Sequence, residues 1–298
     1  MQRPSLLKAG DKIVILSPSR QINESQLNRA IEVLNGWGLE VSLANNVLSR
    51  DGYFAGTDEE RLQDLQNAIN DPKISAVFCS RGGYGLSRII DDLDLTVLKT
   101  NPKWIIGFSD ITALHLKINQ IGIESIHGLM PVQFEYDGVD KSIESLKHML
   151  FEEFFSYEWA SSINNVEGIA EAEIIGGNLS LLVDSLGTKT EINTDNKILF
   201  IEEIDEYYYK IDRMLNQLYR AGKFQNLKGL IVGQFTDLKD TQIPFGHSLA
   251  EIILSKIENK SLPAAFNSPF GHEAYNLAIP CGRKVKLSVD KNGTSLSG

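Results

Sequence analysis

Cysteine is rare in this chain of 298 residues, which contains only two, Cys79 and Cys281. The two stand far apart, and the sequence has no CxxC pair, no HExxH motif and no His/Cys cluster with the spacing of a metal site. These absences exclude a disulfide scaffold and a zinc module as classes, and we expect neither a metal nor another cofactor.

Long apolar runs are also missing. The first run, 13–16, ends in Ser-Pro-Ser at 17–19, whereas the apolar part of a signal peptide needs roughly 7–15 residues. No later stretch approaches the roughly 20 apolar residues of a membrane span. We therefore expect a cytoplasmic protein that does not enter a membrane.

Basic residues are in deficit, with 29 Lys and Arg against 39 Asp and Glu and a net charge of −10. No block of Lys and Arg forms a stripe, so neither nucleic acids nor anionic membranes are expected partners. Hydrophobic residues make up 42% and charged residues 23%, which is typical of a globular protein. The length is sufficient for two domains, each with its own core.

Short apolar runs alternate with helical patterns through the first half of the chain, as parallel βα units do. The predicted strands are 12–16, 40–44, 74–79 and 104–108, and the predicted helices are 24–37, 58–69, 86–93 and 111–120. Asp58 stands where it would cap the second helix, and Pro72 lies beyond that helix's end. This order predicts an open, mostly parallel sheet with helices on both faces.

The pattern changes near 151–166, a stretch of aromatic, Ser and Asn residues. Beyond it we predict strands at 169–175, 197–201, 229–235 and 284–289 and helices at 209–219 and 247–257. The domains predicted are 1–155 (α/β), a linker at 156–170, and a smaller mixed α/β domain at 171–298.

The segment 104–110, WIIGFSD, is typical of a strand that runs into a tight turn and then a helix. Such an elbow holds the Ser109 hydroxyl out of the sheet, near free backbone N–H groups that can stabilise an oxyanion. Ile111 stands where the usual elbow has a second glycine. The alternative is that Ser109 only caps the helix.

A second turn at a strand end, 79–85, reads CSRGGYG. It does not fit the GxGxxG turn of a dinucleotide site, because Arg88 occupies the last position and the turn does not follow the first strand. Glycine can instead let a backbone N–H approach a substrate carbonyl. Since the carboxyl ends of parallel strands meet at one edge, we expect this turn and Ser109 to share a rim.

A nucleophilic serine needs a base, and the five histidines are His115, His127, His148, His247 and His272. We interpret the first and third as packed or surface helix residues. His127 ends a strand, and His247 and His272 each follow Phe-Gly, so that spacing does not choose between these two. A carboxylate must orient the base. Glu202 and Glu203 end an apolar run on opposite sides of a strand, so only one can point into a cleft; an exposed pair is the alternative.

Six segments in this order resemble the LD-carboxypeptidase family of serine peptidases, which includes murein tetrapeptide carboxypeptidases and microcin-immunity peptidases. They are SRGGYG at 80–85, GFSD at 107–110, GGNL at 176–179, FIEE at 200–203, Tyr209 with DRML at 212–215, and Gly271-His272 with PCG at 280–282. Leu129 departs from the family's His-Gly-Pro-Met, where proline is expected, and this difference affects the shape of the pocket.

The resemblance implies that Ser109 is the nucleophile, His272 the general base and Glu202 its orienting carboxylate. It implies backbone N–H groups of Gly83 and Asp110 as the oxyanion hole. The implied fold is a flavodoxin- or Rossmann-like first domain with a swivelling C-terminal domain. With the triad divided between them, we expect the active site at the domain interface.

The implied substrate is a murein tetrapeptide or related small peptide, which loses a C-terminal D-alanine from an L-configured centre during cell-wall recycling. Because members of this family often form homodimers, the resemblance also implies a possible homodimer. Candidates for substrate contact are Arg81, Gly82, Tyr84 and Asn178, and Arg81 and Arg283 could each pair with a substrate carboxylate.

Two other functions stay open. A microcin-type immunity peptidase would cleave a peptide–nucleotide conjugate and hold its base on an aromatic platform, for which the candidates are Trp37, Trp159, Tyr207 and Tyr208. A two-domain ligand-binding protein without catalysis would not need an intact set of serine, glutamate and histidine.

Overall fold

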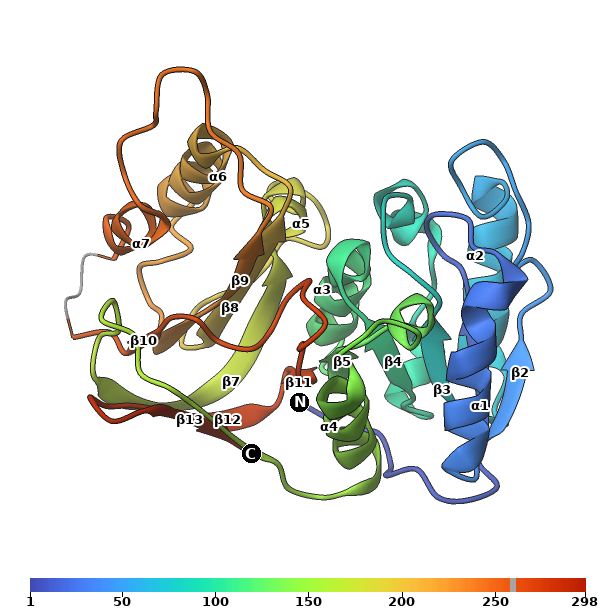
Figure 1. The fold of residues 1–298 in the computed structure, drawn as a ribbon. Helices are drawn as coiled ribbons and strands as arrows, with labels where there is room; N and C mark the ends of the chain where they lie inside the picture. The colour runs from blue at the N-terminus through green and yellow to red at the C-terminus, as the bar shows by residue number, and fades with distance from the viewer. Residues whose placement is uncertain (258–260) are drawn as a thin grey trace. The chain divides into compact units, whose positions relative to one another are not determined.

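The computed structural model describes residues 1–257 and 261–298 and divides into two compact units (Figure 1). Unit 1 comprises Met1–Glu153 and Ala274–Gly282, and unit 2 comprises Phe154–Glu273 and Arg283–Gly298. The chain therefore returns to unit 1 for one short segment before it ends in unit 2. The predicted linker, 156–170, contains a strand of unit 2 and the first residues of another.

Unit 1 is built on a six-stranded sheet in the order β11-β5-β4-β3-β1-β2. Its strands are β1 Lys12–Leu16, β2 Glu40–Leu43, β3 Ile74–Cys79, β4 Trp104–Gly107, β5 Ser125–His127 and β11 Ile279–Cys281. All are parallel except β11, which pairs antiparallel with β5. The order β2-β1-β3-β4-β5 is the flavodoxin-type order, which confirms the predicted open and mostly parallel sheet.

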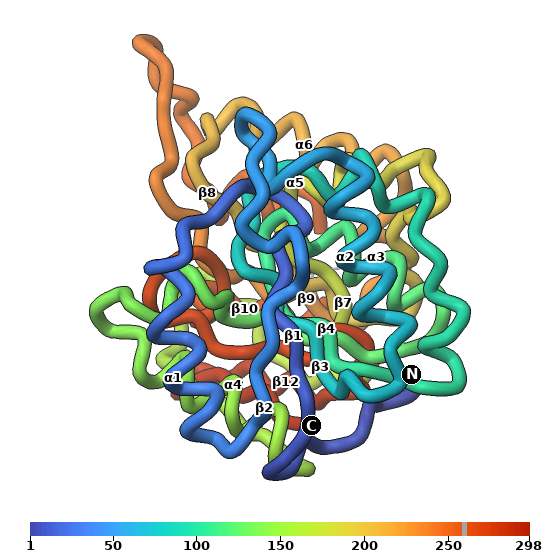
Figure 2. Tube along the Cα trace, turned by 90° about the vertical axis from the view of Figure 1, so that its right-hand side faces the viewer, coloured from blue at the N-terminus to red at the C-terminus, as the bar shows by residue number. Residues whose placement is uncertain are grey.

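Helices cover both faces of this sheet, as predicted. Figures 1 and 2 show α1 Asn28–Gly36 and α4 Asp140–Phe151 on one face, and α2 Asp58–Asn70 and α3 Thr112–Gln120 on the other. Every residue of β4 is buried, because a parallel strand between two helical layers has no face in water. The first predicted helix begins as a 3₁₀ turn, η1 Glu24–Leu27.

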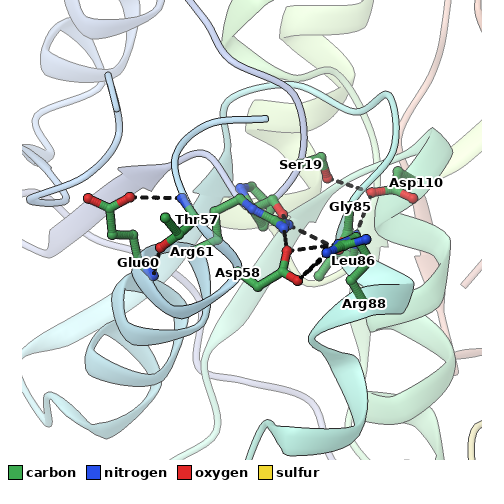
Figure 3. A network of polar contacts seen from close by, with 10 residues as sticks. Ser19, Thr57, Asp58, Glu60, Arg61, Gly85, Leu86, Arg88 and Asp110 are labelled. Atoms are coloured by element: carbon green, nitrogen blue, oxygen red, sulfur yellow. Dashed lines mark hydrogen bonds and ion pairs between the residues drawn. The ribbon is translucent and has the colours of Figure 1, made fainter. Parts of the chain in front are cut away.

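Two local predictions in unit 1 are wrong. Thr57, not Asp58, caps α2: its side chain accepts from the N–H of Glu60, whose carboxylate accepts from the N–H of Thr57 (Figure 3). The segment 86–93 is no α-helix but two short 3₁₀ turns, η2 Leu86–Arg88 and η3 Ile90–Asp92. Neither turn has a side-chain cap, and a segment so short does not hold an α-helix by itself.

Unit 2 has a mixed seven-stranded sheet in the order β10-β9-β8-β7-β12-β13-β6. The strands are β6 Ser156–Trp159, β7 Gly168–Asn178, β8 Ile198–Ile204, β9 Gly229–Thr236, β10 Ala264–Ala265, β12 Lys284–Val289 and β13 Thr294–Ser297. The half from β10 to β7 is parallel, and the half from β7 to β6 is antiparallel. This arrangement confirms the mixed α/β second domain.

The helices of unit 2 pack together, with α6 Tyr208–Arg220 in contact with both α5 Leu179–Asp184 and α7 Leu249–Leu254. The last of these is shorter than the predicted helix 247–257. It begins after His247 because Ser248 and Glu251 form a capping box, and it ends at Leu254. Across residues 1–257 and 261–298, none of the helices combines the length and the apolar character needed to cross a bilayer.

Candidate active site

Ser109 lies at a sharp bend between β4 and α3. Its φ angle is +64°, in the left-handed region that residues other than glycine rarely adopt, which costs on the order of 1 kcal/mol. A 3₁₀ turn, η5 Ser109–Ile111, leads into α3, and neither element has a side-chain cap. The half-buried Ser109 is the first residue of η5, and the N-cap positions of η5 and α3 are held by Phe108 and Ile111. The geometry therefore does not support Ser109 as a mere helix cap.

The glycine turn after β3 lies directly against this serine. A Cβ added to Gly82 would stand 2.9 Å from the Cβ and 3.1 Å from the Oγ of Ser109, so only glycine permits this approach. Gly83 has a φ angle of +115°, which also favours glycine. The glycine turn and Ser109 thus lie side by side within unit 1, as expected, because β3 and β4 are adjacent strands.

The side chain of Asp110 ties the bend to its surroundings. It is 1% exposed, and its Oδ2 accepts hydrogen bonds from Ser19 Oγ at 2.6 Å and from the Leu86 N–H at 2.9 Å (Figure 3). The resemblance in sequence implies only a backbone role for Asp110, and no sequence pattern singles out Ser19. No local pattern signals the contact, because these residues come from three separate strand ends.

The buried carboxylate of Glu202 and the partly buried ring of His272 form a hydrogen-bonded pair in unit 2. The Oε2 of Glu202 lies 2.6 Å from the Nδ1 of His272, and their side chains are 0% and 12% exposed. Since a carboxylate only accepts, Nδ1 carries the proton and Nε2 remains as the basic nitrogen. Burial lowers the pKa of His272, but the charge of Glu202, its hydrogen bond and the charge of Glu203 together raise that pKa above its ordinary value.

Glu203 points to the other side of β8, as the alternation of a strand requires. Its carboxylate accepts from Asn178 Nδ2 at 2.8 Å, Ser180 N at 2.8 Å and Ser180 Oγ at 2.7 Å. Burial raises the pKa of Glu203 in spite of these donors. The alternative of an exposed glutamate pair is wrong, because both carboxylates are buried.

Gln234 holds the loop that carries His272, and sequence reasoning missed it. Its backbone N–H donates to the Phe270 carbonyl at 2.7 Å, and its Oε1 accepts from the Glu273 N–H at 2.9 Å. Gly233 allows the close contact, since a Cβ there would stand 2.3 Å from the Phe270 oxygen. The histidine is therefore bracketed on both sides by one residue of β9.

Two of the remaining histidines are exposed and two are buried. The side chains of His148 and His247 are 49% and 67% exposed, and each lies near a glutamate four residues further along the chain. His127 is fully buried at the end of β5, with its ring centroid 5.4 Å from that of Phe108. The structure thus pairs His272, rather than His247, with the buried carboxylate of Glu202.

His115 is a packed residue beneath the serine bend. Its Nε2 lies 2.8 Å from the Gly107 carbonyl oxygen, and its Nδ1 lies 2.9 Å from Ser125 Oγ. Because the carbonyl only accepts, Nε2 carries the proton and Nδ1 accepts from the serine hydroxyl. Burial lowers the pKa of His115 to about 4, against the opposing effect of the hydrogen bond to Gly107.

We expect this histidine to make the protein sensitive to acid. The unfolded state binds its proton below the ordinary pKa of 6.5 and the folded state only near 4, so stability is lost as pH falls between these values. The full loss amounts to about 3 kcal/mol. Urea unfolding at pH 7 and pH 5 checks this: His115→Gln should be less stable at pH 7 but should lose less on acidification. His148→Gln is the control that should keep the wild-type pH dependence.

The predicted substrate contacts have mixed surroundings. Arg81 is half-buried and donates to the Gln21 carbonyl at 3.2 Å, whereas Tyr84 is 48% exposed. Asn178 is buried and caps α5 while it binds Glu203, so its side chain already has structural partners. Arg283 is buried against the Phe155 ring.

Three of the aromatic candidates for a nucleobase platform pack against other aromatic residues of their own unit. Trp37 packs edge-on against Phe151 in unit 1, and Trp159 packs edge-on against Phe270 in unit 2. Tyr207 lies beside Tyr209, with ring centroids 5.6 Å apart. In the part of the chain that the structure describes, no group of three His, Cys, Asp or Glu side chains could hold a metal ion.

Two protein-family models match this chain. The model of the LD-carboxypeptidase N-terminal domain matches residues 13–128, and that of the LD-carboxypeptidase C-terminal domain matches residues 171–287. Ser109 falls in the first match, and Glu202 and His272 fall in the second.

Individual proteins are similar over almost the whole chain. A probable murein peptide carboxypeptidase of Bacillus subtilis is 36% identical over 292 residues, which cover 96% of this chain and 92% of that protein. The murein tetrapeptide carboxypeptidase of Pseudomonas aeruginosa is 31% identical, with 94% of each covered. The crystal structure of muramoyltetrapeptide carboxypeptidase from Oxalobacter formigenes matches with a TM-score of 0.88 at 29% identity, over 96% of this chain and 98% of that chain.

Proposed function

Since the chain belongs to the LD-carboxypeptidase family, we propose that it is a serine carboxypeptidase that removes the C-terminal D-alanine of murein tetrapeptides. The observation that carries the proposal is the hydrogen bond between the buried Glu202 carboxylate and His272 Nδ1, 2.6 Å long, which leaves Nε2 as a base. The strained bend at Ser109 adds a half-buried hydroxyl that does not occupy a helix N-cap position.

In the proposed reaction, His272 Nε2 takes the proton of Ser109 as Oγ attacks the carbonyl carbon of the scissile amide. Glu202 holds the imidazole in the required tautomer and stabilises its positive charge. The N–H groups of Gly83 and Asp110 donate to the oxyanion, and each such donor lowers the barrier by about 3 kcal/mol. His272 then protonates the leaving amine of D-alanine, and water hydrolyses the acyl-enzyme.

The substrate class rests on the relatives. The Bacillus subtilis, Pseudomonas aeruginosa and Oxalobacter formigenes proteins are described as acting on murein peptides or muramoyl tetrapeptides. The family name, LD-carboxypeptidase, refers to cleavage of a bond between an L-configured centre and a C-terminal D-amino acid. Arg81, half-buried near the glycine turn, is our candidate for holding the new or terminal carboxylate of such a peptide.

The test is release of D-alanine from L-Ala-γ-D-Glu-meso-diaminopimelyl-D-Ala by the purified wild-type chain. We expect release from this tetrapeptide but none from its C-terminal L-alanine counterpart, nor from a pentapeptide whose last bond joins two D-alanines. A Ser109→Ala preparation supplies the background. No release by a folded wild-type protein would overturn the proposal and favour the peptide–nucleotide conjugate, or a binding protein if that also remained uncleaved.

A further inference from the structure

A buried arginine of unit 1 lies between the loop that follows β1 and the glycine turn that follows β3. Arg61, on α2, is 1% exposed, and its Nη1 donates to the Pro18 carbonyl at 2.8 Å and to the Gly85 carbonyl at 3.0 Å (Figure 3). These carbonyls belong to the loops that follow β1 and β3. One guanidinium therefore joins two loops at the carboxyl edge of the sheet to a helix.

The positive charge of this guanidinium is balanced by the carboxylate of Asp58. Arg61 Nη2 donates to the carboxylate of Asp58, which also accepts from Arg88 Nε at 2.9 Å and Nη2 at 2.6 Å. The hydrogen bond from Arg88, with the charges of both arginines, lowers the pKa of Asp58. Asp58 is thus charged at neutral pH and can balance the positive charge of the buried Arg61. Without such a partner, a buried arginine would be strongly destabilising.

The glycine turn leaves room for the arginine. Gly85 has a φ angle of +152°, and a Cβ at this position would stand 2.6 Å from Arg61 Nη1. The next residue, Leu86, donates its N–H to Asp110 Oδ2 at 2.9 Å. The end of the turn is therefore fixed twice, with the Gly85 carbonyl on Arg61 and the Leu86 amide on Asp110.

Asp110 follows Ser109 directly, so its carboxylate couples the turn to the serine bend itself. The same oxygen accepts from Ser19 at 2.6 Å, and Ser19 follows the Pro18 carbonyl that Arg61 binds. The three loops thus form a closed circuit of hydrogen bonds through Arg61 and Asp110. Gly82, at the other end of the turn, packs against the Ser109 side chain.

We propose that Arg61 and the Asp110 carboxylate are positioning residues, which hold the turn 82–86 against the serine bend and so align the Gly83 and Asp110 amides with the oxyanion that forms when Ser109 attacks. This inference rests on the proposed function. Arg61 touches neither substrate nor Ser109; it acts through the carbonyl of Gly85. Its loss lets the turn shift, and a displaced oxyanion donor stabilises the transition state less while ground-state binding is little changed.

The test compares Arg61→Met with Lys103→Met. Lys103 is a matched control because it directly precedes β4, at the amino end of the strand rather than at the carboxyl end. Lys103 is also fully buried, and its Nζ donates to the carbonyls of Ala68 (3.0 Å) and Asp71, at the end of α2. Both variants bury an apolar chain and orphan two carbonyls. We expect Arg61→Met to lower kcat about 100-fold with KM changed less than about threefold, and Lys103→Met to change kcat less than about twofold, for a similar drop in Tm.

A second measurement separates alignment from folding. A boronic acid analogue of the substrate forms a tetrahedral adduct with a catalytic serine, so Arg61→Met should weaken its binding by about the same factor as kcat. Arg61→Lys, which keeps the charge and can still donate to one carbonyl, should recover part of both losses. If Arg61→Met does not fold, Arg61→Lys and Ser19→Ala carry the test, each with an expected fall of about tenfold in kcat.

The outcomes are distinct. If the wild-type enzyme releases D-alanine but Arg61→Met and Lys103→Met lose the same kcat, the positioning role is overturned and the proposed function stands. The same holds if kcat falls without weaker boronate binding. If the wild-type chain neither releases D-alanine nor binds the boronate, the proposed function fails, and the positioning role fails with it.

Discussion

Replacing Ser109 with alanine is expected to lower kcat/KM for D-alanine release by about 10⁴-fold or more, because the attacking oxygen is removed and water must take its place. The residual rate reports what binding and the backbone N–H groups of the oxyanion hole still contribute. Release of D-alanine under saturating substrate, followed over hours for the variant, measures the ratio. A burst of D-alanine at high wild-type concentration would add evidence for an acyl-enzyme on this oxygen.

The strain at Ser109 provides a matched control. At a φ angle of +64°, alanine keeps the steric cost of a side chain, whereas glycine adopts this conformation without it. Ser109→Gly should therefore be as inactive as Ser109→Ala but more stable by about 1 kcal/mol, as measured by urea unfolding. Substantial activity in either variant would contradict the assignment of Ser109 as the nucleophile. Equal inactivity with the expected order of stabilities would separate loss of chemistry from loss of fold.

The parallel sheet of unit 1 could be predicted because each strand is a short buried apolar run that ends in a turn. β1, β3 and β4 lie where their residue patterns placed them. The four-residue strands β6 and β13 were not predicted, since four residues with alternating exposure leave little pattern. The return of Ala274–Gly282 to unit 1 is a long-range pairing of β11 with β5, for which no local signal exists.

The candidate site was predicted unevenly for the same reason. The strand–turn–helix elbow made Ser109 a candidate but left a helix cap as the alternative, and the residues alone left His247 and His272 undecided. The resemblance implied the nucleophile role of Ser109 and chose His272. The structure adds Gln234 and Arg61, whose contacts are to backbone carbonyls or amides of distant segments. Such contacts leave no motif in the sequence, because almost any residue can supply a backbone carbonyl.

Glu202→Gln tests the other half of the proposed triad through its pH dependence. The isosteric amide keeps the shape of the buried site but removes the charge that favours the imidazolium, and we expect kcat/KM to fall about 10³- to 10⁴-fold. Glu203→Gln is the matched control, because its carboxylate lies on the opposite side of β8 with Asn178 and Ser180. Its effect on kcat/KM should be far smaller.

The acid limb of the pH–rate profile shows which carboxylate sets the state of the base. His272 must be neutral to accept a proton, so the rate falls as pH drops through its pKa, which Glu202 holds above the ordinary 6.5 in spite of burial. In Glu202→Gln only the charge of Glu203 still opposes burial, and burial is the larger effect, so the limb should move below pH 6.5. Glu203→Gln should move it in the same direction by less. A limb that stays in place in Glu202→Gln, or moves more in Glu203→Gln, would mean that another group titrates, and the pair of Glu202 and His272 would lose its assigned role.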